Sequence, residues 1–366
     1  MKICSRLTMA ILGCALVLAA CDSGDNAATG DAGASDGGAR PNPVTDGGFA
    51  LKPFTRPNVG ALGAGQLLLT ASGESLALTG YPFPARNAGD PVFADGWQID
   101  FTHLLVTYDK ISLSENPDRV PTDQSETDGV IAEADGPWAF DLHEDEPSYL
   151  GGKEEGSRAV PFAVLSSQNR NGNAAFATDG TKYAVGFEST TATSDAVNVN
   201  LGVEALEAYQ EMIRDGCVVL YVGTATFKGD AECAGAGAKD GDGGVLSRLP
   251  VSVPFRLCFK SPTSYVNCDN QDNQGAASNG EPHPRGIAFP PNKMVTGEIT
   301  LHTDHPFWES TQHDTPSHFD QLAARLGPGE ASVTMNDLVG LDYTGFVDRA
   351  GEAVPWRICD PSYQNP

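Results

Sequence analysis

Short apolar runs of strand length recur along this chain, and Gly, Pro, Asn and Asp punctuate the gaps between them. The clearest run begins at Trp97, where Trp97, Ile99 and Phe101 alternate with polar residues before the segment becomes apolar on both faces. Alternation with a period of two is typical of a half-buried β-strand, and apolar residues on both faces indicate entry into a core. Similar runs cover residues 66–73, 75–80, 161–165, 183–187, 217–222, 251–259, 295–303 and 332–335. They predict many short strands.

Only two segments have the spacing of an amphipathic helix. An apolar residue recurs every three or four positions over 203–214, and Gly216 follows as a stop. The second segment begins with Thr315 and Pro316, which suit the N-cap and the first helical position, and it ends before Gly327. Many strands with few helices predict a mainly β fold, an antiparallel β-sandwich with two or three short decorating helices and long loops.

The first twenty residues have the parts of a secretory signal peptide: Lys2 and Arg6 at the front, an apolar run, and Leu-Ala-Ala before Cys21. A Cys directly after Leu-Ala-Ala resembles the lipobox of bacterial lipoproteins. The resemblance implies cleavage before Cys21, diacylglycerol on its sulfur and an acyl chain on its new amine. The alternatives are an ordinary signal peptide or a membrane helix with a chance Cys, although residues 9–20 are too few to span a bilayer. The resemblance covers only these first residues, and no functional family is recognised for the mature domain.

A polar segment follows the predicted cleavage site. Residues 22–48 consist mainly of Gly, Asp, Ala, Ser, Thr, Asn and Pro, and such a composition buries too little apolar surface to offset the entropy of ordering. We therefore divide the chain into a signal peptide (1–20), a lipidated Cys with a flexible acidic tether (21–61) and a β-rich globular domain (62–366). The expected location is the bacterial cell envelope, with the choice between inner and outer membrane open.

The chain is strongly acidic, with 23 Lys and Arg against 48 Asp and Glu. Without Lys2 and Arg6 the side chains carry 21 − 48 = −27. Such a charge repels phosphate, which argues against nucleic acid as a partner, and it repels anionic lipid headgroups, so the acyl chains must provide the membrane anchor. It also attracts cations, although solubility alone explains an acidic surface equally well.

Eight Cys occur, and five of them follow the lipobox. The exported compartment is oxidising and permits disulfides. Cys217 begins an apolar run, where a Cys is more often a small buried hydrophobe than a bridge partner. We expect two disulfides among the remaining Cys233, Cys258, Cys268 and Cys359. The sequence leaves three pairings open, of which we favour Cys258–Cys268 with Cys233–Cys359.

Four His lie within seventeen residues, and Asp304 stands among them. Side chains two apart on a strand share a face, so His302 and Asp304 are expected to point together, away from the apolar face of 295–301. A loop of about ten residues can bring a helix start back to this strand end. Imidazole and carboxylate suit Zn and Cu, so the predicted metal ligands are His302, Asp304, His305, His313 and His318. The alternative is that these His cap loops and pair with nearby carboxylates.

Other chemistry is weakly represented. Asp240 and Asp242 alternate in an acidic turn, but the third ligand and the distant Glu of a calcium loop are missing, so calcium is less favoured than Cu or Zn. Gly-x-Ser-x-Gly, phosphate-loop and Rossmann motifs are absent from the sequence, and we assign no catalytic residue.

The sequence therefore predicts a lipid-anchored envelope protein that binds or handles Cu or Zn through its His/Asp cluster. An alternative is a surface binding or adhesion module that recognises a glycan or an envelope protein through loops and aromatic residues such as Trp308, with structural His residues. A weaker alternative is a metal-dependent hydrolase, and a non-enzymatic role is favoured.

Overall fold

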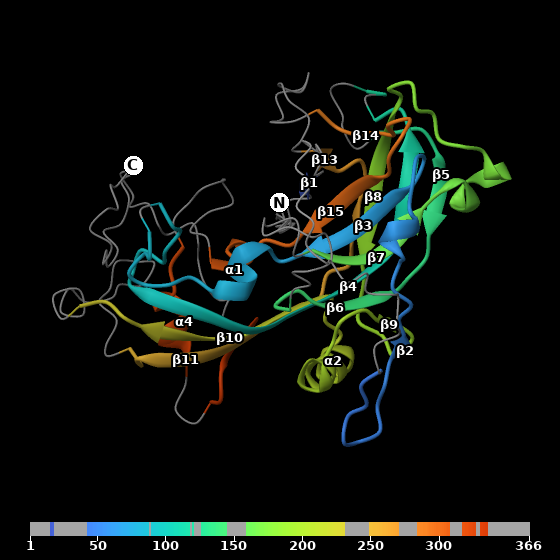
Figure 1. Cartoon of the computed structure of the whole chain (residues 1–366). Coiled ribbons are helices and arrows are strands. Elements are labelled where there is room, and N and C mark those ends of the chain that lie inside the picture. Colours follow the sequence, from blue (N-terminus) through green and yellow to red (C-terminus); the bar gives the residue numbers. More distant parts are fainter. Residues whose placement is uncertain are drawn as a thin grey trace, which may run out of the picture.

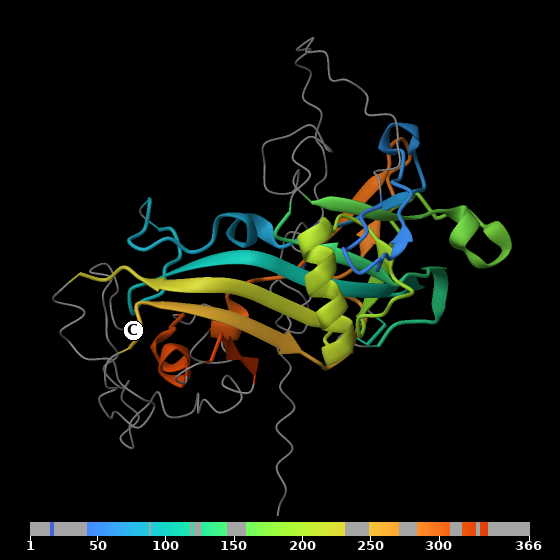
Figure 2. The ribbon, with the colours of Figure 1, turned by 90° about the horizontal axis from the view of Figure 1, so that it is seen from below.

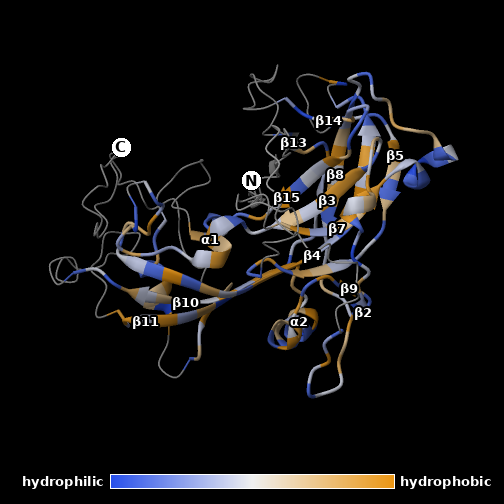
Figure 3. Ribbon diagram, viewed as in Figure 1, coloured by the Kyte–Doolittle hydropathy of each residue, from blue (hydrophilic) through white to orange (hydrophobic). Residues whose placement is uncertain are grey.

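The computed structural model describes residues 15–17, 42–87, 89–117, 119–120, 126–144, 159–230, 249–270, 284–307, 317–326 and 330–335. Over these residues the protein is mainly β with few short helices, consistent with the predicted β-sandwich (Figure 1). Apolar residues concentrate on the strands and on one side of the longest helix (Figure 3). One cluster of buried side chains contains residues from both sheets, so the sheets share a core.

The larger sheet is built around β4 (Trp97–Glu115), which is nineteen residues long. Its antiparallel neighbours are β5 (Val130–Ala134), β6 (Trp138–Asp141), β8 (Lys182–Ser189) and β10 (Val219–Phe227). The sheet is extended by β2 (Lys52–Pro53), β9 (Val197–Asn198), β11 (Ser252–Phe259), β12 (Thr263–Tyr265), β14 (Ile287–Ala288) and β16 (Val333–Thr334). Figure 2 shows β11, β10 and the first part of β4 side by side.

The smaller sheet has the order β13 (Asp269–Asn270), β1 (Ala15–Val17), β15 (Val295–Thr300), β3 (Leu67–Ser72) and β7 (Val160–Leu165). Its central pair, β15 and β3, is parallel, and the register aligns Thr300 with Ser72 at the carboxyl ends of both strands. β1 lies inside the predicted signal peptide and pairs with both β13 and β15.

The helix predicted over 203–214 is confirmed as α2 (Val203–Asp215), which ends at Gly216 with a φ of 73°. α2 lies across the face of the larger sheet (Figure 2), and its buried side chains, including Tyr209, pack against Leu105 and Leu220. A buried hydrogen bond of 2.9 Å between the Tyr209 hydroxyl and Thr107 ties α2 to β4.

The second predicted helix is present as α4 (Asp320–Arg325), and its expected start at Thr315 and Pro316 lies outside the described residues. Within the described residues, Phe319 is the N-cap and the Asp95 carboxylate accepts the N–H groups of Phe319 and Asp320. The 3₁₀ helices are η1 (Val59–Ala61), η3 (Ser167–Asn169), η4 (Asn171–Asn173) and η5 (His305–Phe307).

The strand predicted over residues 75–80 is wrong, because this segment forms the helix α1 (Glu74–Thr79). The Ser72 hydroxyl accepts the N–H of Glu74 at 2.8 Å, and Gly80 ends the helix with a φ of 66°. A run with so few apolar residues fits one helical turn as well as a strand, so its periodicity did not distinguish the two.

The prediction for Cys217 is also wrong, and so is the favoured pairing of Cys258 with Cys268. Cys217 forms a disulfide with Cys258, with their Cα atoms 5.4 Å apart. Cys217 precedes β10, which begins at Val219, and both Cys residues face the layer between α2 and the larger sheet. Cys268 is disulfide-bonded as well. Cys233 and Cys359 lie outside the described residues.

Residues assigned to the tether contact the domain. Lys52 and Pro53 pair with β9, and Leu51 is buried against the α2 layer. The folded part of the chain therefore begins before Leu62. Among the helices that the structure describes, none combines the length and the apolar character needed to cross a bilayer.

Candidate metal centre

The site is built where two parallel strands end at the same edge of the smaller sheet. β3 ends at Ser72 and β15 ends at Thr300, and the N–H of Leu301 donates to the Ser72 carbonyl at 2.9 Å. His302 follows β15 by two residues and Glu74 follows β3 by two residues, so the strand register places them side by side. His302 Nε2 lies 3.6 Å from Glu74 Oε1.

Three of the predicted ligands converge at this edge. One ligand atom from each of His302, Asp304 and His305 lies within 4.8 Å of the other two. The imidazole rings of His302 and His305 are stacked with centroids 5.0 Å apart, and Asp304 Oδ1 lies 3.9 Å from His305 Nε2. Two imidazoles and a carboxylate in this arrangement form a donor set that Zn(II) and Cu(II) accept.

Core contacts hold the backbone of this loop. The Tyr221 hydroxyl donates to the His302 carbonyl at 3.1 Å, and the hydroxyls of Tyr81 and Thr303 are hydrogen-bonded at 2.8 Å. Phe307 follows at the end of η5, where its ring is 2% exposed and packs against other core aromatic rings. A ligand set carried on a backbone fixed in this way is pre-organised for binding.

Asp304 has an uncommon environment for a carboxylate. Its Oδ1 is buried, and among the described residues no donor makes a hydrogen bond to it. Burial, followed by the charge of Asp304, holds the pKa of the Tyr81 and Tyr221 phenols well above the ordinary value, so both remain neutral. A buried carboxylate oxygen without a donor is costly, and a bound cation would satisfy it.

His318 does not join this cluster. Its side chain is almost fully buried, and its Nδ1 lies 3.8 Å from the Asp95 carboxylate that caps α4. Its backbone N–H donates to the Phe307 carbonyl at 3.1 Å, so the backbone of His318 lies near the loop that carries the cluster. Its ring nevertheless lies beside Asp95. Of the four predicted ligands that lie within the described ranges, three therefore converge. His313 lies outside those ranges, as do Trp308, Asp240 and Asp242.

The two other His that the structure describes have local partners. The ring of His103 is partly exposed, and its Nδ1 lies 2.7 Å from the buried Asp141 carboxylate. His143 Nδ1 donates to the Ala77 carbonyl at 2.7 Å. The first contact links β4 to β6, and the second links the turn after β6 to α1.

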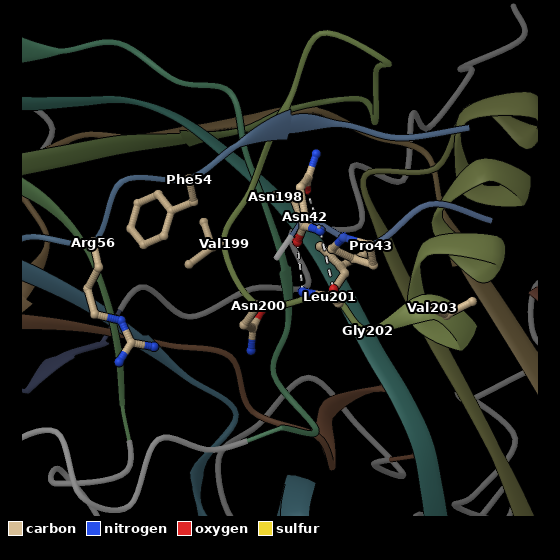
Figure 4. Close-up of a pocket in the computed structure, with 10 residues that line it drawn as sticks. All are labelled: Asn42, Pro43, Phe54, Arg56, Asn198, Val199, Asn200, Leu201, Gly202 and Val203. Atoms are coloured by element: carbon tan, nitrogen blue, oxygen red, sulfur yellow. Dashed lines mark hydrogen bonds between the residues drawn. The ribbon is translucent and has the colours of Figure 1, made fainter. Parts of the chain in front are cut away.

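A separate cavity of about 300 Å³ lies between the N-terminal segment and the start of α2. Its lining residues are Asn42, Pro43, Phe54, Arg56, Asn198, Val199, Asn200, Leu201, Gly202 and Val203 (Figure 4). The carboxamides in its wall are engaged internally: Asn198 bonds to Asn42 and Leu201, and Asn200 bonds to the backbone of Asp141. The cavity has the size for a small polar ligand and contains one aromatic ring, Phe54.

Sequence reasoning missed Glu74 as a neighbour of the cluster. The tripeptide Ser72-Gly73-Glu74 carries no metal-binding motif, and only the parallel register of β3 with β15 brings Glu74 to His302. Comparison with known proteins gives no further guide, because no family model, no curated protein and no solved structure matches the chain.

Proposed function

We propose that this protein is a lipid-anchored envelope protein of bacteria that binds a divalent transition metal ion, Cu(II) or Zn(II), at His302, Asp304 and His305. Two observations carry the proposal: ligand atoms of these three residues converge, and the Asp304 Oδ1 is buried and receives no hydrogen bond from the described residues. A cation bound there would compensate the Asp304 Oδ1, to which no described residue donates a hydrogen bond.

The donor set also limits the kind of ion. It holds nitrogen and oxygen donors and no sulfur, so it suits Zn(II) and Cu(II) better than the softer Cu(I). Three protein ligands leave at least one position for water or an exchanging ligand, which suits transfer of the ion to a partner. The acidic chain raises the local concentration of cations near the membrane.

The metal proposal is tested on the untagged domain that follows Cys21 in the chain. Elemental analysis and titration with Zn(II) and Cu(II) should show one ion per chain. The double variant His302→Ala/His305→Ala should lose it. His143→Gln is the matched control, because it removes an imidazole outside the cluster while retaining a hydrogen-bonding side chain. Wild-type protein without metal, or a double variant that binds as wild type does, would contradict the proposal.

The anchor is tested separately. Palmitate labelling in a bacterial host should modify the wild-type precursor at Cys21 and should leave Cys21→Ala unlabelled and uncleaved. Equal labelling of both would remove the lipoprotein assignment without affecting the metal site.

The second candidate is a binding module for a glycan or an envelope protein. The cavity near α2 favours it, because its size suits a small polar ligand and the ring of Phe54 lies in its wall. Binding to a glycan array that Phe54→Ala abolishes would support this role.

A hydrolase is the third candidate. It requires turnover of an ester or phosphoester by the wild-type protein, and this turnover should be lost in His302→Ala/His305→Ala.

A further inference from the structure

A second carboxylate, Glu74, faces the metal-binding cluster from α1. Its Oε1 is 3.6 Å from His302 Nε2, and the side chains are 30% and 24% exposed. Glu74 is not part of the group whose ligand atoms all lie within 4.8 Å of one another. The carboxylate therefore reaches His302 without reaching every member of the cluster, as expected for a group that acts on His302.

The backbone at Glu74 is strained. Its φ is +60°, in the left-handed region that glycine adopts easily and other residues rarely do. Its N–H is held by the Ser72 hydroxyl at 2.8 Å, and the residue opens α1. A glycine would fit this conformation without strain but would lack the carboxylate. Strain of this kind collects at functional sites, where the side chain has a role that offsets its cost.

We propose that Glu74 is a positioning residue for the metal centre: its carboxylate accepts the Nε2 proton of His302 and so leaves Nδ1 as the nitrogen that binds the ion. The proposal rests on the function proposed above. Metal-binding His residues commonly donate their second ring N–H to a carboxylate, which fixes the tautomer and the ring orientation and makes the ligand nitrogen more basic. A shift of roughly 0.5 Å by the part-exposed Glu74 side chain brings the present distance to hydrogen-bond length.

Glu74 also completes the charge of the site. Asp304 and Glu74 together carry two negative charges, which match those of a divalent cation held by two neutral imidazoles. The site is therefore suited to a divalent transition metal ion, bound through two imidazole nitrogens and the Asp304 carboxylate. The Glu74 carboxylate would contact His302 and not the ion.

The first test uses the metal-free mature domain at pH 8.5, where an ordinary imidazole is neutral. We expect the wild-type protein to show a protected His302 Nε2–H signal in ¹⁵N NMR spectra and Glu74→Ala to lose it. Glu188→Ala is the control, since Glu188 pairs with Lys110 at the surface at 3.4 Å. Absence of the protected signal from the wild-type protein would overturn the proposal.

The second test measures metal binding. Glu74→Ala should weaken Zn(II) binding by about 10–100-fold, and its saturated Co(II) spectrum should keep the wild-type shape because the ligands are unchanged. Glu74→Gly should show the same loss of affinity in a chain that folds without the left-handed strain. An altered Co(II) spectrum would overturn the proposal by making Glu74 a direct ligand, and unchanged affinity would overturn it too. A wild-type protein that binds no ion would defeat the proposed function, and the NMR signal would then decide alone whether Glu74 orients His302.

Discussion

Ser72, the last residue of β3, and Leu301, the first residue after β15, are joined by a hydrogen bond of 2.9 Å between the Leu301 N–H and the Ser72 carbonyl. This bond continues the register of β3 with β15 one step beyond the last paired residues. Both strands end here, and Glu74 and His302 follow them at the same edge of the sheet. The site is therefore a consequence of strand pairing, and core contacts position the residues proposed as ligands.

Asp304 should contribute to stability only when an ion is bound. At a Zn(II) concentration of about 100 times its dissociation constant, binding should raise the free energy of unfolding of the wild-type domain by about 2.7 kcal/mol. Asp304→Asn keeps the shape of the side chain and removes its charge, so the gain should be lost. The metal-free variant should be at least as stable as the metal-free wild type, because it no longer buries a carboxylate oxygen without a donor. Differential scanning calorimetry with and without Zn(II) measures both. An equal gain in the variant would show that Asp304 does not hold the ion.

Replacing Glu74 should separate stability from metal binding. Glu74→Gly relieves a φ of +60°, and after allowing for the greater chain entropy of Gly it should raise the metal-free free energy of unfolding by about 0.5–1 kcal/mol. Urea denaturation of metal-free wild type, Glu74→Gly and Glu74→Ala checks this, with Ala expected to show no such gain. A destabilised Gly variant would mean that Glu74 is needed for the fold.

The disulfide between Cys217 and Cys258 should be important for the stability of the α2 layer. The two residues are 41 positions apart, so the bond restricts a long loop in the unfolded chain. Replacing both with Ser should lower the free energy of unfolding by about 2–5 kcal/mol. Denaturation of the oxidised variant and wild type measures this, and peptide mapping under non-reducing conditions identifies the pairing. A Cys258–Cys268 peptide would contradict the structure.

Buried tyrosines should make the protein sensitive to alkali. Burial raises the pKa of Tyr209 to about 12, whereas the unfolded chain has an ordinary value near 10. Above pH 10 the unfolded state releases its proton first, so this contribution is complete below pH 10 and is lost as the pH rises through 12. The loss is about 2–3 kcal/mol. Urea midpoints from pH 9 to 12 should fall less steeply for Tyr209→Phe. Parallel curves for the two proteins would argue against the effect.

Cleavage before Cys21 should change the smaller sheet. It would remove β1, the strand that pairs with β15 through Leu16 and Val17. In the mature protein, the β15 amides that face β1 should then exchange with deuterium faster than those of β3, which keeps β7 and β15 as neighbours. Hydrogen-exchange mass spectrometry compares the two strands directly. Equal protection would mean that another segment takes the place of β1.

The sequence predicted elements whose signals are local. The alternation around Trp97 and the spacing of 203–214 specify β4 and α2, because each pattern lies within one segment. The proximity of His302 to Asp304 was predicted from two-residue spacing on a strand, but β15 ends at Thr300, and the loop after it brings the two side chains together. The Cys217–Cys258 bond and the approach of Glu74 to His302 depend on which strands become neighbours, which a single sequence does not encode in any local pattern. The strand prediction over 75–80 failed for a different reason, because the segment is too short to show whether its apolar residues follow the period of a strand or of a helix.

Anomalous X-ray diffraction from a crystal of the mature domain soaked in Zn(II), recorded at the zinc absorption edge, tests the central claim most directly. We predict one strong peak about 2.0–2.2 Å from ligand atoms of His302, Asp304 and His305. A crystal whose only peaks lie elsewhere, for example beside His318 and Asp95, would contradict the assignment of the metal centre.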